Sequence, residues 1–264
     1  MTKWTPARIR ALKGKDPFAT VTVFDYTSAR FADQADFPYL LVGDSLGMTV
    51  LGHSSTLPVT MDIMVHHTSA VMRGVKNAIV VADLPFMSYQ VTHDLALQNA
   101  GRLLQEAGAD AVKLEGGAER GQLISRIVQN GIPVTGHIGL TPQSVKTMGY
   151  QVQGKSSKQA ERLKADALAL QDAGVFSLVI EACPTDLAAE ITASLEIPTI
   201  GIGAGPHCDA QILVYHDLLG LFPDMKPKFV KQYAQLGEQT TQALKAYQED
   251  VKTRRFPAAE NSYT

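Results

Sequence analysis

The sequence predicts an α/β fold, a single (β/α)8 TIM barrel with parallel strands. Short continuous apolar runs alternate with longer helical patterns, as expected for strand-helix units around a parallel sheet. Eight such runs can be counted, and 264 residues divided by eight gives 33, the length that one strand, one helix and two loops require. No shift in composition and no Pro/Gly/Ser-rich linker divides the chain, so we expect one domain over residues 1–264.

The first element is expected to be a helix near the start of the chain. Thr5 and Pro6 are typical of an N-cap and a first helical position, and Ile9 and Leu12 form an apolar stripe behind them. The basic residues among the first 15 also weakly resemble a transit peptide. The N-cap pattern favours an ordinary helix in a cytoplasmic protein.

The expected strands follow at regular intervals along the chain. They cover residues 19–24, 39–42, 78–82, 111–114, 133–138, 175–180, 198–202 and 218–221. The helical stretches between them end where a glycine can supply a C-terminal cap. The clearest of these stretches cover residues 95–107, 122–130 and 158–173, followed by Gly108, Gly131 and Gly174.

The C-terminal part differs from the repeated units. Residues 228–247 carry a stripe of helical period through Phe229, Tyr233, Leu236 and Leu244, which would pack on the barrel or on another subunit. From about residue 248 onward, charged and polar residues predominate, and we therefore expect a flexible tail there.

Net charge and cysteine content exclude several classes of protein. Lys+Arg 24 against Asp+Glu 26 gives a net charge of −2, so the sequence has no basic field to hold nucleic acid or an anionic membrane. No apolar run approaches the ~18 residues of a membrane span. Cys183 and Cys208 cannot make a disulfide scaffold, which indicates a reducing compartment. The partners that remain are small molecules.

Polar residues end nearly every apolar run, and in a barrel these positions form the active site. Because the C-terminal ends of the strands meet at one mouth, we expect these side chains to lie close together. They are Asp44 and Ser45 after the second run, Asp83 after the third, Lys113 and Glu115 at the fourth, His137 in the fifth and Glu181 after the sixth.

The acids Asp44, Asp83 and Glu115 would lie on consecutive units of this mouth. Such like charges cannot all stay ionised without a cation. Oxygen ligands with no His or Cys beside them suit Mg²⁺ better than Zn²⁺ or a fully caged Ca²⁺. The alternative is that Asp44 and Asp83 only cap the helices that follow them.

Lys113 and Glu115 are two residues apart on one strand, so both side chains would point into the mouth. A substrate carboxylate is the most economical partner for Lys113 there, and Ser45 adds a hydroxyl donor. The alternative is an ion pair between Lys113 and Glu115 that only holds the barrel together.

Two further residues are candidates for proton chemistry. Glu181 emerges directly from an apolar strand, a setting that disfavours the charged carboxylate and suits a general base, although a helix cap or a salt bridge is the alternative. His137 could donate a hydrogen bond to a substrate oxygen or be a satisfied core histidine. The glycines at 201, 203 and 205 do not match the dinucleotide pattern and indicate ligand access at most.

Six motifs carry a family resemblance. They are residues 42–48 (VGDSLGM), 55–60 (STLPVT), 82–87 (ADLPFM), 112–117 (VKLEGG), 136–144 (GHIGLTPQS) and 200–205 (IGIGAG). Together they resemble the 3-methyl-2-oxobutanoate (ketopantoate) hydroxymethyltransferase family, in the family's order, from about Thr20 to about Tyr233. Residues 181–184 (EACP) depart from the family's more common ECVP or EGVP.

The resemblance implies a barrel of the phosphoenolpyruvate mutase/isocitrate lyase-like kind and assigns a role to each polar residue at the mouth. Asp44, Asp83 and Glu115 would surround Mg²⁺, Ser45 and Lys113 would hold the carboxylate of an oxo acid, and Glu181 would take a proton. The substrate site would then comprise Asp44, Ser45, Asp83, Lys113 and His137.

The resemblance also implies a reaction. A hydroxymethyl group would pass from 5,10-methylenetetrahydrofolate to 3-methyl-2-oxobutanoate through a Mg-stabilised enolate, forming 2-dehydropantoate for pantothenate and coenzyme A biosynthesis. The family resemblance further implies a homo-oligomer, a decamer of pentameric rings.

Two other functions remain open on the sequence. One is a Mg-dependent 2-oxo-acid C–C lyase or mutase of the isocitrate lyase/phosphoenolpyruvate mutase superfamily, although the Lys-x-x-Cys-Gly-His stretch usual there is absent from this sequence. The other is a non-catalytic metal or folate-binding protein, which needs no base, so that Glu181→Gln would leave its function intact.

Overall fold

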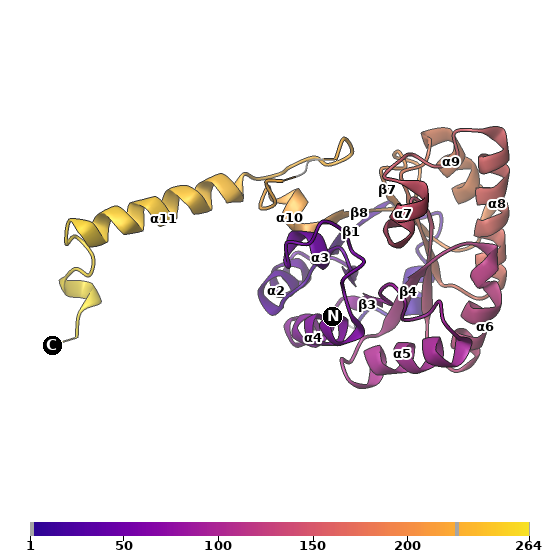
Figure 1. The fold of residues 1–264 in the computed structure, drawn as a ribbon, viewed down its shortest axis with the longest axis horizontal. Helices are drawn as coiled ribbons and strands as arrows, with labels where there is room; N and C mark the ends of the chain where they lie inside the picture. The colour runs from indigo at the N-terminus through magenta and orange to yellow at the C-terminus, as the bar shows by residue number, and fades with distance from the viewer. Residues whose placement is uncertain (1–2, 225–226, 264) are drawn as a thin grey trace. The chain divides into compact units, whose positions relative to one another are not determined.

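A closed barrel of parallel strands forms the first of two compact units of the chain. The computed structural model describes residues 3–224 and 227–263, and the units are Met1–Val214 and Tyr215–Thr264. Each strand pairs in parallel with the next one along the chain, and β8 pairs with β1 to close the ring (Figure 1). The predicted (β/α)8 barrel is confirmed.

The strand bounds agree with the sequence prediction except at the end of the barrel. The strands are β1 Phe18–Thr22, β2 Tyr39–Val42, β3 Ile79–Asp83, β4 Ala111–Glu115, β5 Val134–Gly139, β6 Ser177–Glu181, β7 Thr199–Ile202 and β8 Ala210–Val214. The first seven begin and end within two residues of the predicted positions.

The prediction for the last strand, residues 218–221, is wrong. The observed β8, Ala210–Val214, pairs with β1 over five residues, from Phe18↔Ala210 to Thr22↔Val214. Residues 218–221 instead include the end of the short helix α10, Tyr215–Leu218, in the second unit. The apolar part of β8 is only Ile212–Val214, because Gln211 is an exposed polar residue within it, so the sequence pattern there was weak.

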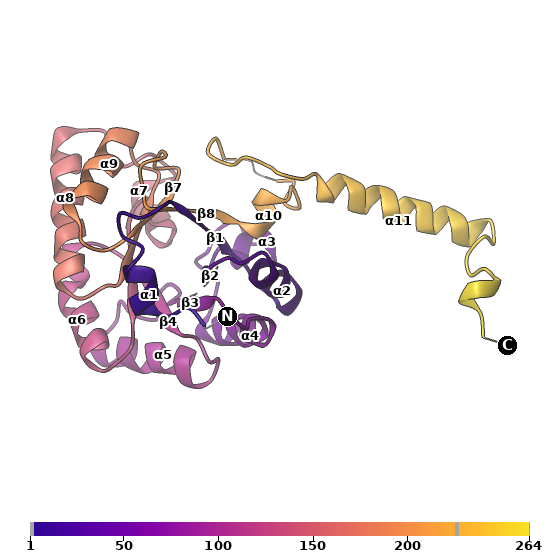
Figure 2. The same cartoon turned by 180° about the vertical axis from the view of Figure 1, so that it is seen from behind.

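Helices connect the successive strands from β1 to β7 and lie around the outside of the barrel (Figures 1 and 2). Those of the first unit are α1 Pro6–Arg10, α2 Tyr26–Gln34, α3 Leu46–Thr49, α4 Met61–Gly74, α5 His93–Gln105, α6 Gly121–Gln129, α7 Val145–Met148, α8 Ser157–Asp172 and α9 Thr185–Ser194, with 3-10 turns η1 Ala118–Arg120 and η2 Pro142–Ser144. Helix α1 precedes β1, and the described residues 203–209 between β7 and β8 form no helix. The predicted glycines Gly108, Gly131 and Gly174 follow α5, α6 and α8 and have positive φ, as helix C-terminal glycines do.

Helix α1 begins where the sequence predicts. The Thr5 hydroxyl accepts a hydrogen bond from Arg8 N at 3.3 Å, and Pro6 occupies the first turn. Ile9 is fully buried and belongs to the hydrophobic cluster that includes Tyr39 and Ile79 of the barrel. The first helix therefore packs against the barrel core. Leu12, just after this helix, is partly buried and packs against the same cluster.

A buried carboxylate ties the last two strands to the start of the chain. Asp209, directly before β8, accepts hydrogen bonds from Thr199 N at 2.8 Å and Gly14 N at 3.0 Å, and it pairs with Lys13 Nζ at 3.0 Å. Burial opposes its negative charge, but these donors hold the pKa of Asp209 below its usual value. The contacts lie at the N-terminal ends of the strands, where barrel residues serve stability.

The second unit consists of short elements and one long helix. After α10 come α11, Leu236–Lys252, and the turn η3, Ala259–Asn261. Helix α11 continues beyond residue 248, and Arg255 pairs with Asp250 at 2.8 Å after its end. Leu244 of the predicted apolar stripe lies within α11 and is exposed. In the described parts of the chain, no helix is both long and apolar enough to cross a membrane.

Replacement of Asp209 by alanine should lower the free energy of unfolding by about 3 kcal/mol at neutral pH, because buried donors lose a charged acceptor. Since the folded-state pKa is lowered, this contribution is present above the unfolded pKa of about 3.9 and disappears as the pH falls through the folded value. The difference in urea midpoint between wild type and variant should therefore narrow as the pH falls below about 4.

The exposed Asp16 on the same N-terminal segment provides the matched control. Asp16→Ala should change the free energy of unfolding by no more than about 0.5 kcal/mol. If Asp209→Ala were no more destabilising than Asp16→Ala, Asp209 would not fasten these strands.

Candidate active site

The two-residue period of the strands places the polar side chains inside the barrel mouth. In β3, β4 and β6 the interior cluster contains Val81, Ala111 and Val179, and side chains two positions further along a strand share that face. The next residues on these faces, together with His137 of β5, form the polar group at the mouth. They are Asp83, Lys113, Glu115, His137 and Glu181, and Asp44 joins them from the turn after β2.

Lys113 is the cation at the centre of this polar group. Its Nζ lies 3.0 Å from Asp83 Oδ1 and 3.3 Å from His137 Nδ1, and its side chain is 5% exposed. Burial opposes the positive charge, but the neighbouring carboxylates together raise the pKa of Lys113 above its usual value. The lysine therefore remains charged. Its ion pair is with Asp83, whereas an ion pair that only holds the barrel together was expected with Glu115.

The carboxylates of Asp44 and Asp83 are buried side by side. Asp83 Oδ2 accepts a hydrogen bond from Asp44 N at 3.0 Å. Burial is the main cause that raises the pKa of both groups, and Asp83 and Glu115 raise that of Asp44 further. Asp83 Oδ1 has no well-aligned hydrogen bond within the described residues, although Lys113 is close. Negative charge at this place is therefore undercompensated by the chain itself.

Neither aspartate caps a helix, which was the alternative function for these residues. Helix α3 begins after Ser45, with no side-chain bond at its N-cap, and α5 is capped by the Thr92 hydroxyl. Helix α9 likewise begins after Pro184 without a side-chain cap, so Glu181 caps nothing there either. Their carboxylates are left to face the mouth.

The donor set at the mouth fits a hard divalent cation. Within residues 3–224 and 227–263, no three His, Cys, Asp or Glu side chains stand close enough together to form a complete metal-ligand set. Mg²⁺ is usually bound through one or two carboxylates, with water and substrate oxygens completing its coordination. Buried acids with raised pKa values and an Asp83 oxygen without a well-aligned donor match that requirement.

His137 lies between two of the acids. Its Nε2 is 3.2 Å from Glu181 Oε2, and its Nδ1 is 3.6 Å from Glu115 Oε1. Burial and Lys113 oppose protonation, but the two carboxylates outweigh them and raise the pKa of His137 to about 9. His137 is therefore a member of the polar group at the mouth and not a histidine of the apolar core.

The backbone around Glu181 is tightly constrained. Ala182 has a φ of +48°, a left-handed conformation that costs a residue with a Cβ roughly 1–2 kcal/mol. Gly139 of β5 lies against the same turn, since a Cβ there would be 2.1 Å from Glu181 O. These contacts fix the direction in which the Glu181 side chain leaves β6. The departure of EACP from the family's ECVP or EGVP falls on the strained Ala182 and on Cys183.

Small residues make room at the other side of the mouth. A Cβ on Gly43 would lie 3.0 Å from both Ser45 Oγ and Thr22 Cγ2, so these side chains would have to shift by a few tenths of an ångström to admit it. Ser45 itself is partly exposed at the edge of the site. Gly205 has a different explanation, because a Cβ there would meet the Thr185 side chain at 2.6 Å, so it serves packing against α9.

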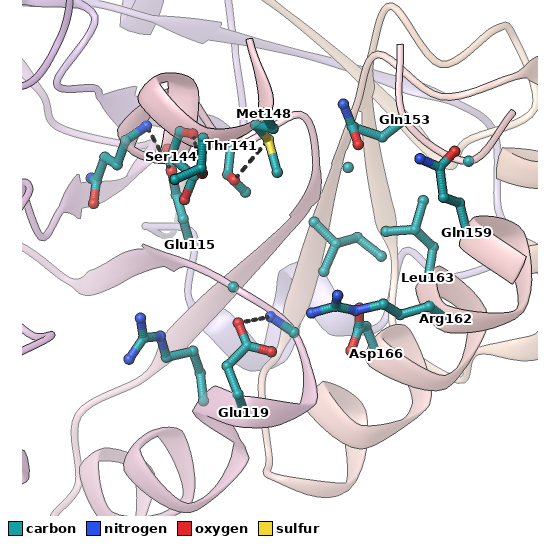
Figure 3. Close-up of a pocket in the computed structure, with 18 of the residues that line it drawn as sticks. Glu115, Glu119, Thr141, Ser144, Met148, Gln153, Gln159, Arg162, Leu163 and Asp166 are labelled. Atoms are coloured by element: carbon teal, nitrogen blue, oxygen red, sulfur yellow. Dashed lines mark hydrogen bonds and ion pairs between the residues drawn. The ribbon is translucent and has the colours of Figure 1, made fainter. Parts of the chain in front are cut away.

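A cavity of about 400 Å³ adjoins Glu115, whereas Asp44, Asp83 and Glu181 do not line it. Figure 3 shows Glu115, Thr141 and Ser144 on one side of it and Arg162, Leu163 and Asp166 of α8 on the other. Gln143 also lines it. Glu115 and Gln143 thus connect the cavity with the polar group at the mouth.

Gln143 and Tyr89 are site residues that the sequence analysis did not single out. Both are buried, and the Tyr89 hydroxyl donates to Gln143 Oε1 at 2.7 Å. Gln143 lies four residues after the end of β5, within the motif GHIGLTPQS, so its place in that motif was the available signal. Cys183 is a buried free thiol, and burial raises its pKa to about 12.

The closed parallel barrel defines the class of fold, and solved structures share this fold. The chain is similar to a 2,3-dimethylmalate lyase of the PEP mutase/isocitrate lyase superfamily, with a TM-score of 0.61 and 19% identity over 100% of this chain and 89% of that one. It is also similar to a phosphoenolpyruvate phosphomutase from Streptomyces platensis subsp. rosaceus, with a TM-score of 0.62, 16% identity and coverage of 98% and 92%.

Sequence comparison is more specific than the fold. The ketopantoate hydroxymethyltransferase family matches residues 3–259. The 3-methyl-2-oxobutanoate hydroxymethyltransferases of Moorella thermoacetica and Carboxydothermus hydrogenoformans are 57% and 54% identical to the chain, covering 98% and 100% of it and 97% and 96% of their own lengths. The chain therefore belongs to the ketopantoate hydroxymethyltransferase family, as its motifs predicted, and is an enzyme of the transferase class.

Replacement of Ala182 by glycine should stabilise the protein, because glycine adopts positive φ without strain. We expect a gain of about 1 kcal/mol and a melting temperature higher by about 2 °C, measured by differential scanning calorimetry. Ala188→Gly, a buried position within α9, is the control and should destabilise by about 1 kcal/mol. Equal losses in both variants would show that the turn after Glu181 stores no strain.

Proposed function

We propose that the protein transfers a hydroxymethyl group from 5,10-methylenetetrahydrofolate to 3-methyl-2-oxobutanoate, forming 2-dehydropantoate for pantothenate and coenzyme A biosynthesis. The observation that carries this proposal is the position of Glu181, which lies beside His137 and across the mouth from a lysine and three buried acids. Membership in the ketopantoate hydroxymethyltransferase family supports it. This arrangement supports a base next to a place for a chelating anionic substrate.

Asp44, Asp83 and Glu115 would surround Mg²⁺, with one or two of them as direct ligands and water completing its coordination, as their buried and undercompensated charge supports. When bound, the cation would supply a Lewis acid that stabilises the negative charge developing on the oxo oxygen. Lys113, held by Asp83 at 3.0 Å, would attract the substrate carboxylate, and the Ser45 hydroxyl would donate to it. These residues orient the oxo acid so that its C3 faces β6.

Glu181 would remove the proton from C3. The electron pair of the broken C–H bond enters the enolate, whose carbon then forms the new C–C bond to the methylene group of the folate. One C–N bond of that methylene bridge breaks as the C–C bond forms, and the other is replaced by a C–O bond to water. The two folate nitrogens take up the proton from Glu181 and one proton from water, and tetrahydrofolate leaves. His137 Nε2, 3.2 Å from Glu181 Oε2, would orient the carboxylate for proton abstraction.

We infer that the protein acts in the cytoplasm as a homo-oligomer, a decamer of pentameric rings. Exposed apolar side chains on α11, Leu244 and Tyr247, support an assembled state, because large apolar groups on one helix face favour a partner surface.

Glu181→Gln should abolish deuterium exchange at C3 of 3-methyl-2-oxobutanoate in D2O containing Mg²⁺, since an amide cannot accept the proton. We expect the rate of exchange, measured by proton NMR, to fall at least about 100-fold, which is the lower end of the range for loss of a general base. Glu190→Gln, an exposed acid of α9, should exchange like wild type. Exchange at the wild-type rate in Glu181→Gln would mean that another group is the base.

Removal of divalent cations by EDTA should stop the same exchange, and Mg²⁺ should restore it, because the enolate needs its charge stabilised. Product analysis with and without 5,10-methylenetetrahydrofolate then separates the transferase from a lyase. A transferase forms 2-dehydropantoate only with the folate, whereas cleavage of 2-dehydropantoate or a related acid without folate would support the lyase alternative.

A further inference from the structure

Gln143 occupies an unusual position between two of the acids at the mouth. It lies in η2, Pro142–Ser144, four residues after the end of β5, and is 5% exposed. Its side chain and its backbone both donate hydrogen bonds to carboxylates, but to different ones. Nothing in the proposed proton transfer uses this residue, and it has neither charge nor nucleophilic character.

The Gln143 amide is fully hydrogen-bonded, which fixes its orientation. Nε2 donates to Asp44 Oδ2 at 2.8 Å and to Leu84 O at 3.0 Å. Oε1 accepts from the Tyr89 hydroxyl at 2.7 Å and from Gln90 Nε2 at 3.2 Å. A primary amide has two donors and two acceptor positions, so all four are used. Turning the amide over would set its oxygen against the Asp44 and Leu84 oxygens.

The backbone of Gln143 holds the second acid. Its N–H donates to Glu115 Oε2 at 3.0 Å. Tyr89 supports the same strand end from the other side, because its hydroxyl accepts from Glu115 N at 3.2 Å while donating to Gln143. One residue, itself braced by Tyr89, therefore sets the orientation of both Asp44 and Glu115.

We propose that Gln143 is a positioning residue for the divalent cation, holding Asp44 through its side chain and Glu115 through its backbone, with Tyr89 fixing the amide. This inference rests on the proposed function of the site. A carboxylate offers about four lone-pair positions, so a single hydrogen bond orients it and leaves capacity for a cation. Replacement of a residue that orients metal ligands in this way typically lowers metal affinity on the order of 10- to 100-fold.

The direct test is the affinity for Mn²⁺, which takes the same oxygen ligands as Mg²⁺ and whose free form is counted by electron paramagnetic resonance. Gln143→Met keeps the size of the side chain and the backbone N–H to Glu115 but removes the donor to Asp44. We expect its dissociation constant for Mn²⁺ to rise at least about 10-fold. Gln129→Met, an exposed glutamine of α6, should bind like wild type.

A double-mutant cycle tests whether Tyr89 acts through Gln143. Tyr89→Phe alone should weaken Mn²⁺ binding about fivefold, the equivalent of one hydrogen bond. If the two residues form one unit, Tyr89→Phe should add little to Gln143→Met. The rate of C3 exchange in Gln143→Met should recover as Mg²⁺ is raised, which a merely structural loss would not show.

The outcomes separate this inference from the proposed function. Wild-type protein that binds no Mn²⁺, with or without the oxo acid, would overturn the metal-dependent function and this inference with it. Wild-type binding with unchanged affinity in Gln143→Met would overturn the positioning role alone. Circular dichroism establishes that each variant is folded, and if Gln143→Met is not, unchanged Mn²⁺ affinity in Tyr89→Phe would overturn the proposal.

Discussion

The site depends on one electrostatic constraint: several carboxylates share a buried mouth with a single lysine and a histidine. Parallel strands with a two-residue period, closed into a ring, bring Asp83, Glu115 and Glu181 onto one interior face. Burial and mutual repulsion raise the pKa of Asp44 and of Asp83, and Lys113 offsets only part of that charge. A net charge of −2 for the whole chain conceals this local excess, which a divalent cation would relieve.

The way in which each buried acid is hydrogen-bonded distinguishes structure from chemistry. Asp33 accepts bonds from Lys76 N, Asn77 N and Ala78 N at 2.9 to 3.0 Å, and Asp209 is similarly occupied by backbone donors. The oxygens of such carboxylates are occupied by hydrogen bonds that hold the backbone in place. Asp44 and Glu115 instead receive one bond each from Gln143, so their oxygens are oriented but not consumed. This difference marks the mouth as the place where the protein keeps acids available for a ligand.

Most of the fold and the candidate site followed from local sequence, because apolar runs and the polar residue that ends each run are visible in the chain. What did not follow depended on three-dimensional partners. The sequence predicts the last strand several residues after the observed β8, because β8 is defined by its pairing with β1 and not by a strong apolar pattern. Gln143 was passed over because an uncharged residue reveals a role only through the groups it touches. The partner of Lys113 is Asp83 on the neighbouring strand, a contact set by register between β3 and β4 and not by spacing within β4.

The central claim is that the acids at the mouth hold a divalent cation and an oxo acid so that C3 faces Glu181. Crystals grown with Mn²⁺ and 3-methyl-2-oxobutanoate would test it most directly through the anomalous scattering of the metal. The account predicts one strong anomalous peak within about 2.2 Å of oxygens from Asp44 or Asp83, with the oxo acid beside it and its C3 toward Glu181. A peak elsewhere, or an oxo acid bound with C3 turned away from Glu181, would contradict the account.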